Sequence, residues 1–206
     1  MDKEIFMKRF FVALLLSGAI MVPAAAALKT GEKAPDFSAR ASLAGKEFDF
    51  SLKAALKKGP VVVYFYPSAF TGGCNIEAHT FAKNKEKFDA AGATIIGVSQ
   101  DSIARLNAFS ADPQYCAGKI PVASDADGAI AKAYGLTKTD PRAGMKDTRG
   151  VDIDHAFTER TTFVVTPDAK IAATLSSNDD KISPADHVEK SLAAVKQLTA
   201  GKPSVH

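Results

Sequence analysis

Hydrophobic and polar positions change period along the chain, and these changes predict alternating strands and helices. Residues 61–66 form a continuous β-branched and aromatic run between two prolines, which predicts a strand buried on both faces of a sheet. Residues 75–91 place apolar side chains among lysine, glutamate and asparagine, and Gly92 follows, as is typical of an amphipathic helix that ends at a glycine. Residues 93–98 then predict a second buried strand.

The rest of the chain continues this alternation. Asp101 or Ser102 can cap a helix through residue 109, and the terminal helix 184–198 carries apolar residues on one face. The pattern predicts one domain, an α/β fold built as a three-layer sandwich. The remaining predicted elements are short strands or an extended entry over 28–50, a short strand that closes an edge of the sheet at 123–125, a short helix at 127–134, a long excursion without a clear period at 136–159, and a hairpin of residues 161–166 and 170–175.

The N-terminus has the features of an export signal. Lys8 and Arg9 precede the apolar residues 10–22, and four alanines then end at Ala27. We expect residues 1–27 to be a cleavable signal peptide, residues 28–206 to be the folded domain, and the bacterial periplasm to be its location. An uncleaved membrane anchor is the alternative, but the apolar run is short for a permanent membrane helix.

Charge and composition exclude several classes of function. The chain holds 26 Lys and Arg against 23 Asp and Glu, and the basic residues are scattered rather than clustered, so we expect no nucleic-acid partner. Neither His79 nor His155 has a second metal ligand at a suitable spacing, so we expect both to be solvated or helix-surface histidines. No cofactor, no metal and no stable membrane association are expected.

Cys74 lies where the chemistry of a reactive thiol is favoured. It directly follows the strongest predicted strand and opens the first long helix, where unsatisfied backbone N–H groups favour the nucleophilic thiolate over the thiol. Pro67 can hold the entry to the loop and keep it dry, and glycines at 72 and 73 let the backbone approach closely. Thr71 can turn its hydroxyl toward a bound oxygen. The alternative is a buried, inert thiol.

Two charged residues complete the candidate site. Arg160 stands just before the strand that begins at Thr161, where its guanidinium would stabilise a thiolate and an oxygen if the strand starts near the first helix; a surface ion pair with Glu159 or another neighbour is the alternative. Glu77 is given a supporting role, in which its carboxylate serves the helix dipole and local hydrogen bonds.

These residues resemble the peroxiredoxin family, within it the bacterioferritin comigratory or Q-type branch. Pro67, Thr71 and Cys74 match the family's Pro-x-x-x-Thr-x-x-Cys pattern. Glu77 matches its acidic position, and Arg160 matches the arginine before its Thr-Thr-Phe-Val-Val strand. The similarity extends over residues 28–200 and includes the segments 34–37, 97–102 and 124–128.

The resemblance implies a thioredoxin-like fold and a thiol-dependent peroxidase. In such an enzyme the Cys74 thiolate attacks hydrogen peroxide or an organic hydroperoxide and becomes a sulfenic acid, while Thr71 and Arg160 polarise the O–O bond. A thioredoxin-like or other thiol reductant then resets the cysteine. A monomer or weak dimer is expected.

The resolving step is where the resemblance is incomplete. Many Q-type members carry a second cysteine five residues after the first, but His79 stands there in this chain. Cys116, in a loop flanked by proline and glycine, is the resolving candidate, as in family members that use a more distant cysteine. A structural thiol at Cys116, or a one-cysteine enzyme reduced directly by an external thiol, remains open.

Two other functions fit the same predicted fold. An exported thiol–disulfide oxidoreductase needs a Cys-x-x-Cys motif, but Glu77 occupies its second position, and Ala78 fills the corresponding position of a Cys-x-x-x-Cys copper chaperone. A non-enzymatic binding module would keep Cys74 packed and resistant to alkylation.

Overall fold

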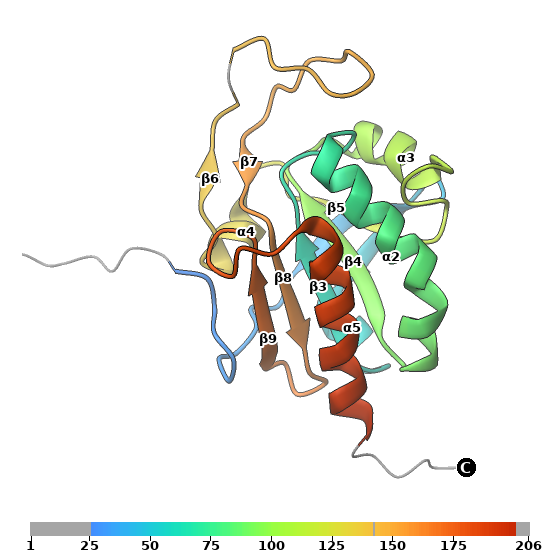
Figure 1. The fold of residues 1–206 in the computed structure, drawn as a ribbon, viewed down its shortest axis with the longest axis vertical. Helices are drawn as coiled ribbons and strands as arrows, with labels where there is room; N and C mark the ends of the chain where they lie inside the picture. The colour runs from blue at the N-terminus through green and yellow to red at the C-terminus, as the bar shows by residue number, and fades with distance from the viewer. Residues whose placement is uncertain (1–25, 142, 201–206) are drawn as a thin grey trace, which may run out of the picture.

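The computed structural model describes residues 26–141 and 143–200, in which one mixed sheet forms the centre of the fold (Figure 1). The predicted signal segment falls almost wholly outside these residues. The sheet has seven strands in the order β2-β1-β5-β4-β3-β8-β9, and β6 and β7 pair separately in the excursion. The strands are β1 (Ser38–Leu43), β2 (Lys46–Ser51), β3 (Val61–Phe65), β4 (Thr94–Ser99), β5 (Val122–Ser124), β6 (Lys138–Thr139), β7 (Phe157–Thr158), β8 (Thr161–Val165) and β9 (Ile171–Ser176).

Helices cover both faces of the sheet and form the outer layers. Because successive side chains of a strand point to opposite faces, Val62 and Tyr64 of β3 enter one core while Val61 and Val63 enter the other. The first core packs under α2, α3 and α5, and the second packs under α1 and α4. The predicted three-layer α/β fold is therefore confirmed. The helices are α1 (Leu52–Leu56), α2 (Gly72–Ala90), α3 (Ile103–Ala111), α4 (Ala129–Ala133) and α5 (Pro184–Ala200).

Strand pairing brings distant segments to the carboxyl end of β3. This strand, buried along its whole length, runs parallel to β4 and antiparallel to β8. In the antiparallel register Phe65, the last residue of β3, pairs with Thr161, the first residue of β8. The residue before β8 therefore lies beside the loop that leaves β3 and enters α2.

Several sequence predictions need correction. The strand predicted to close an edge of the sheet is β5, which lies inside the sheet between β1 and β4. The first long helix begins at Gly72 rather than at residue 75, because Thr71 in an extended conformation is its N-cap. A short helix, α1, was not predicted; the Ser51 hydroxyl caps it by accepting from the Ala54 N–H.

The excursion is more ordered than its sequence suggests. It contains the paired strands β6 and β7, and its outer part carries an isolated antiparallel bridge between Lys146 and Asp152. Figure 1 shows the excursion projecting beyond the end of the sheet, on the side where α2 begins.

Candidate active site

The Cys74 thiol occupies the first turn of α2. Cys74 is the third residue of the helix and is only 2% exposed. The Asn75 N–H donates to the Thr71 carbonyl at 2.8 Å, which starts the helical ladder directly after the loop. The unpaired N–H groups of such a first turn carry partial positive charge, so this position favours an anionic sulfur.

Arg160 reaches the same sulfur from the start of β8. Its Nη2 donates to Cys74 Sγ at 3.2 Å, and its Nη1 is hydrogen-bonded and ion-paired with the buried Glu77 carboxylate. Gly73 permits this approach, because a Cβ atom there would lie only 3.1 Å from Nη2. The predicted meeting of Cys74 and Arg160 is thus present, and the partner of Arg160 is Glu77 rather than Glu159.

Burial and the attraction between the two groups act in opposite directions on the pKa values of Glu77 and Arg160. Burial raises the pKa of Glu77 to about 7, against the opposing effect of the Arg160 charge. Burial lowers the pKa of Arg160, but the charges of Glu77 and Cys74 outweigh burial and raise it overall, so the guanidinium stays cationic. The expectation that Glu77 serves the helix dipole is wrong, because its carboxylate lies in the second turn of α2 and pairs with Arg160.

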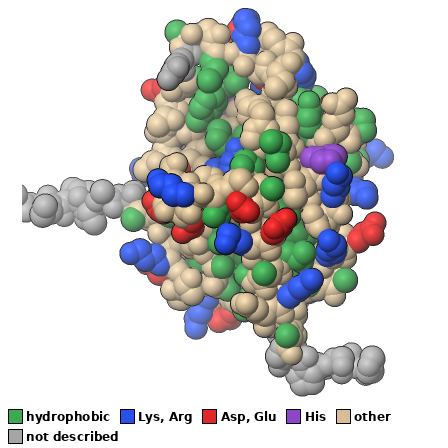
Figure 2. Space-filling view, viewed as in Figure 1, with side chains coloured by type: hydrophobic (Ala, Val, Ile, Leu, Met, Phe, Trp, Pro, Cys, Tyr) green, Lys and Arg blue, Asp and Glu red, His purple; other side chains and the backbone are tan. Residues whose placement is uncertain are grey.

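Pro67 and Thr71 line a cavity at the start of α2. The cavity has a volume of about 210 Å³, and the excursion contributes both apolar residues, Met145, Ile153 and Phe157, and polar residues to its lining. Hydrophobic side chains gather on the visible face beneath the excursion (Figure 2). The Thr71 hydroxyl donates to the Ser68 carbonyl at 2.8 Å rather than capping the helix. The predicted loop residues therefore lie together at an access point to the first turn of α2.

Phe70, just before this turn, has an unusual backbone conformation. Its φ of 61° lies in the left-handed region, which costs a bulky residue on the order of 1–3 kcal/mol. The Arg149 guanidinium stacks on the Phe70 ring with its Cζ 3.2 Å from the ring centre. Contacts from the excursion thus help to hold a strained residue four positions before Cys74.

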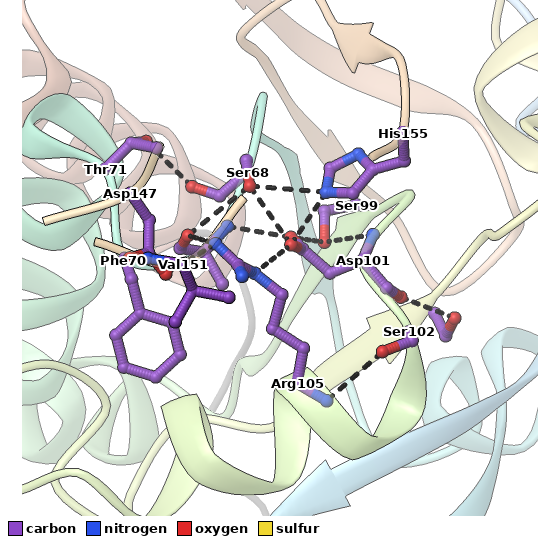
Figure 3. A network of polar contacts seen from close by, with 12 residues as sticks. Ser68, Phe70, Thr71, Ser99, Asp101, Ser102, Arg105, Asp147, Val151 and His155 are labelled. Carbon is purple, nitrogen blue, oxygen red and sulfur yellow. Dashed lines mark hydrogen bonds and ion pairs between the residues drawn. The ribbon is translucent and has the colours of Figure 1, made fainter. Parts of the chain in front are cut away.

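The structure corrects the expectation for His155 and adds residues that sequence analysis missed. The His155 side chain is 11% exposed rather than solvated, and its Nε2 lies 2.8 Å from Oδ1 of Asp101. Asp101, Arg105 and Asp147 form a network with it beside the 68–71 loop (Figure 3). The sequence signal for Asp101 was its place just after β4, since β3 and β4 are parallel and end at the same edge.

Cys116 lies in a turn after α3, where the loop was predicted, and is fully buried. It belongs to the same hydrophobic core as Cys74, and both are free thiols. Burial, with the nearby Asp112 charge, strongly raises the pKa of the Cys116 thiol. Burial is the main cause of the raised pKa values of the Tyr64 and Tyr66 hydroxyls, and both cysteines add to the shift, together with Glu77 for Tyr64 and Asp101 for Tyr66.

Other candidate features lie elsewhere. A larger cavity, about 420 Å³, is lined by Leu52, Leu56 and neighbours on the α1 side and contains none of the predicted site residues. Residues 26–141 and 143–200 contain no group of three or more His, Cys, Asp or Glu side chains that could hold a metal ion. Within the same described ranges, every helix is too short or too polar to cross a membrane.

Comparisons with known proteins agree with this geometry. The model of the AhpC/TSA family matches residues 30–174. The chain is 33% identical to peroxiredoxin Bcp of Xanthomonas campestris over 136 residues, which cover 66% of this chain and 76% of that protein. A Mycobacterium tuberculosis peroxiredoxin is 29% identical over 84% of this chain and 100% of its own length.

Solved structures give the same result. The crystal structure of peroxidoxin BcpB from Mycobacterium tuberculosis superposes with a TM-score of 0.68 at 29% identity, covering 83% of this chain and 98% of that chain. The bacterioferritin comigratory protein of Xanthomonas campestris superposes with a TM-score of 0.59 at 30% identity, covering 78% and 91%. The chain belongs to the AhpC/TSA family and is a thiol-dependent peroxidase of the bacterioferritin comigratory, or peroxiredoxin Q-like, branch.

Proposed function

We propose that Cys74 is the residue that attacks the peroxide. The observation that carries this proposal is the 3.2 Å contact between Arg160 Nη2 and Cys74 Sγ in the first turn of α2. The thiolate attacks the distal oxygen of the hydroperoxide, an S–O bond forms and the O–O bond breaks. The leaving oxygen takes a proton and departs as water or an alcohol, and Cys74 becomes a sulfenic acid. Sulfur is oxidised by two electrons and the peroxide is reduced by two.

The neighbouring residues support this step in different ways. Arg160 favours the thiolate and stabilises the negative charge that grows on the peroxide oxygens. Glu77 holds Arg160 in place through the buried ion pair. The Thr71 hydroxyl donates its proton to the Ser68 carbonyl, so its oxygen can accept the O–H of the hydroperoxide. Pro67 lines the cavity at the start of α2.

Hydrogen peroxide and organic hydroperoxides are the proposed substrates. The cavity beside Thr71 is lined by both polar and apolar residues, and the apolar ones from the excursion, Met145, Ile153 and Phe157, favour the alkyl group of an organic hydroperoxide. The solved structure of the Xanthomonas campestris bacterioferritin comigratory protein is described in terms of alkyl peroxide reduction by that protein. The likeness of the two folds supports the same substrate class here.

Cys116 is proposed as the resolving cysteine. Its thiol attacks the sulfenic sulfur of Cys74, an S–S bond forms, and the sulfenic oxygen leaves as water. Both thiols are free and buried in the same core, and we expect the first turn of α2 and the 112–120 turn to loosen when the disulfide forms. A thioredoxin-like dithiol then reduces the disulfide and restores both thiols.

We further propose that the protein is exported to the bacterial periplasm after cleavage near Ala27 and acts there as a monomer or weak dimer. The charged start, apolar run and alanine stretch of residues 1–27 support export. N-terminal sequencing of protein from periplasmic and cytoplasmic fractions tests it. A mature chain starting near Leu28 in the periplasm is expected, whereas an uncleaved chain in the cytoplasm contradicts export.

The peroxidase proposal is tested by intact mass. The reduced protein receives one equivalent of hydrogen peroxide and is measured without reductant, alongside Cys74→Ser. Loss of two hydrogens within one chain is expected, because Cys74 oxidises and Cys116 resolves it. A gain of oxygen without a disulfide indicates a one-cysteine enzyme. Unchanged mass in the wild type, or peroxide turnover by Cys74→Ser, contradicts the role of Cys74.

A further inference from the structure

The peptide groups of Ala69, in the loop between β3 and α2, are held by side chains rather than by secondary structure. The Ala69 N–H donates to Oδ2 of Asp101 at 2.7 Å, and its carbonyl accepts from Nη2 of Arg105 at 3.0 Å. Oδ1 of the same buried carboxylate accepts from the Ser68 hydroxyl at 3.1 Å and is ion-paired with Arg105 Nε at 2.8 Å. Asp101 and Arg105 therefore determine the path of the chain just before Thr71.

The excursion fixes the next residue. The Phe70 carbonyl accepts two hydrogen bonds from Thr148, one from its N–H at 2.9 Å and one from its hydroxyl at 2.8 Å. Phe70 has the left-handed conformation described above, and such conformations persist only where the surroundings hold them. The strained residue is thus stabilised by a segment more than seventy residues away in sequence.

A further layer holds Asp101 and Arg105 themselves. Nε2 of His155 lies 2.8 Å from Oδ1 of Asp101, and Nδ1 lies 2.9 Å from the Ala156 carbonyl. Both of these partners are acceptors, so only the imidazolium form of His155 donates to both at once. Figure 3 shows His155 and Arg105 converging on the Asp101 carboxylate from different elements.

The Asp147 carboxylate holds the side chains of Arg105 and Arg149. Its Oδ2 accepts from Nη2 of Arg105 and from Nη2 of Arg149, each at 2.8 Å. Arg149 is the residue that stacks on the Phe70 ring. The side chain of Asp147 is fully buried, so its two arginine partners balance a charge that is shielded from water.

We propose that His155 and Asp147 are positioning residues of the peroxide reaction, which act through Asp101 and Arg105 to hold residues 68–71, and with them Thr71 and Cys74, in reactive geometry. The proposal rests on the function assigned to Cys74. Small displacements of reacting groups change rates strongly, so a loosened loop lowers the rate of the first oxidation even when the protein stays folded.

The network gives this positioning a pH dependence. The charged groups that face His155 are Asp101 and Arg105. Burial lowers the pKa of His155, but its hydrogen bond and ion pair with Asp101 outweigh burial and raise it above the ordinary value of 6.5. The contribution of charged His155 is therefore complete below about pH 6.5 and is lost as the pH rises through the raised pKa of the folded protein.

The test compares His155→Ala with His155→Gln. Glutamine keeps an N–H donor for Asp101 but does not titrate. The second-order rate constant of Cys74 oxidation is measured on pre-reduced protein by competition with horseradish peroxidase from about pH 6 to about pH 9, a range in which histidine changes charge. This readout needs no tryptophan, which the chain lacks, and it does not depend on recycling. His79→Gln, on α2 and outside the network, is the matched control.

We expect His155→Ala to oxidise about tenfold more slowly or worse, and His155→Gln to retain most of the rate below pH 6.5. The rate of wild type divided by the rate of His155→Gln should fall as the pH rises, because only the wild type loses the charge of His155. Ionisation of Cys74 affects both proteins equally and cancels in the ratio. Equal rates for wild type and His155→Ala overturn the proposal. The proposal is also overturned if His155→Ala and His155→Gln lose the same fraction of the oxidation rate and both have lowered melting temperatures. That result indicates a purely structural role for His155.

A second variant covers the case in which His155→Ala does not fold. Asp147→Asn keeps the size of the side chain and loses the charge that pairs with Arg105 and Arg149, so a slower oxidation supports the proposal and an unchanged rate overturns it. A wild-type protein that leaves peroxide unconsumed refutes instead the function of Cys74, so the two failures are distinguishable.

Discussion

The guanidinium of Arg160 joins Glu77 and Cys74: it contacts Cys74 Sγ at 3.2 Å through one nitrogen and the Glu77 carboxylate through the other. Arg160 directly precedes β8, and Cys74 and Glu77 lie in the first two turns of α2. Their meeting depends on the β3–β8 register, which places Thr161 opposite Phe65. A planar, forked cation matches this pair of partners better than a point charge would.

Replacing Arg160 tests its electrostatic role. Arg160→Ala should slow Cys74 oxidation by about 10²–10³-fold, the usual cost of losing a donor to developing oxyanion charge. Arg160→Lys should recover only part of the rate, because one ammonium group does not serve both partners equally. Horseradish peroxidase competition gives the rate constants. The matched control is Arg40→Ala, which removes a half-exposed arginine that pairs with Glu47 and Asp49. An Arg160→Ala rate equal to wild type contradicts this role.

Alanine substitutions at two adjacent glycines, Gly72 and Gly73, distinguish the effect of crowding Arg160 from the effect of a changed helix propensity. A methyl group at Gly73 would lie 3.1 Å from Arg160 Nη2 and 3.3 Å from Pro184 Cγ, whereas one at Gly72 meets nothing within 4 Å. Gly73→Ala should therefore displace the guanidinium and slow oxidation severalfold, with a change in unfolding free energy below about 1 kcal/mol. Gly72→Ala should keep the wild-type rate. Similar rates in the two variants would show that Arg160 tolerates the displacement.

Replacing Cys116 separates oxidation from recycling. Cys116→Ser should oxidise at Cys74 as fast as wild type but fail to turn over with thioredoxin, because no disulfide forms. Its buried hydroxyl should also cost about 1–3 kcal/mol of stability, so Cys116→Ala is the second variant. Single-turnover rates and thioredoxin-coupled turnover are measured on both. Full coupled turnover in Cys116→Ala would identify a one-cysteine enzyme.

His187 should make the fold sensitive to acid. The imidazole is buried between the hydroxyls of Thr162, at 3.0 Å, and Ser177, at 2.9 Å. Burial first, and then the Arg160 charge, lower its pKa to about 4. The unfolded chain binds a proton below about pH 6.5 and the folded chain does not, so stability is lost as the pH falls from about 6.5 to about 4.

Urea unfolding at several pH values measures this loss. It should amount to on the order of 3 kcal/mol, because each unit of pKa shift corresponds to about 1.4 kcal/mol. His187→Gln should show a smaller loss over the same pH window, while His79→Gln controls for removing one histidine. A wild-type stability that stays constant from pH 6.5 to pH 4 would contradict the prediction.

Local patterns were sufficient for much of the fold and for the centre of the site. Strand β3 was predicted because a short, uninterrupted apolar run between two prolines is typical of a buried strand. The structure shows β3 buried along its whole length. The position of Cys74 at the start of a helix followed from the same reasoning, since a strand, a glycine loop and a helix are adjacent in sequence. The start of α2 was misplaced by three residues because Thr71, Gly72 and Gly73 have no helical pattern of their own.

Three other errors involve contacts between residues far apart in the chain. β5 looked like an edge strand because it is short, yet strands from both sides pair with it. Glu77 looked like a dipole partner and His155 like a solvated histidine, because their partners, Arg160 and Asp101, are 83 and 54 residues away. Composition and spacing carry no information about such separations.

The sequence by itself determined the alternation of elements and the helix-start position of the thiol, because these depend on interactions between near neighbours. The tertiary structure decided which charges meet that thiol and what holds its loop. The register of β8 against β3 sets the position of Arg160, and the fold of the excursion brings His155 and Asp147 to the network. Strand register and long-range packing are properties of the whole sheet, so no local stretch of sequence specifies them.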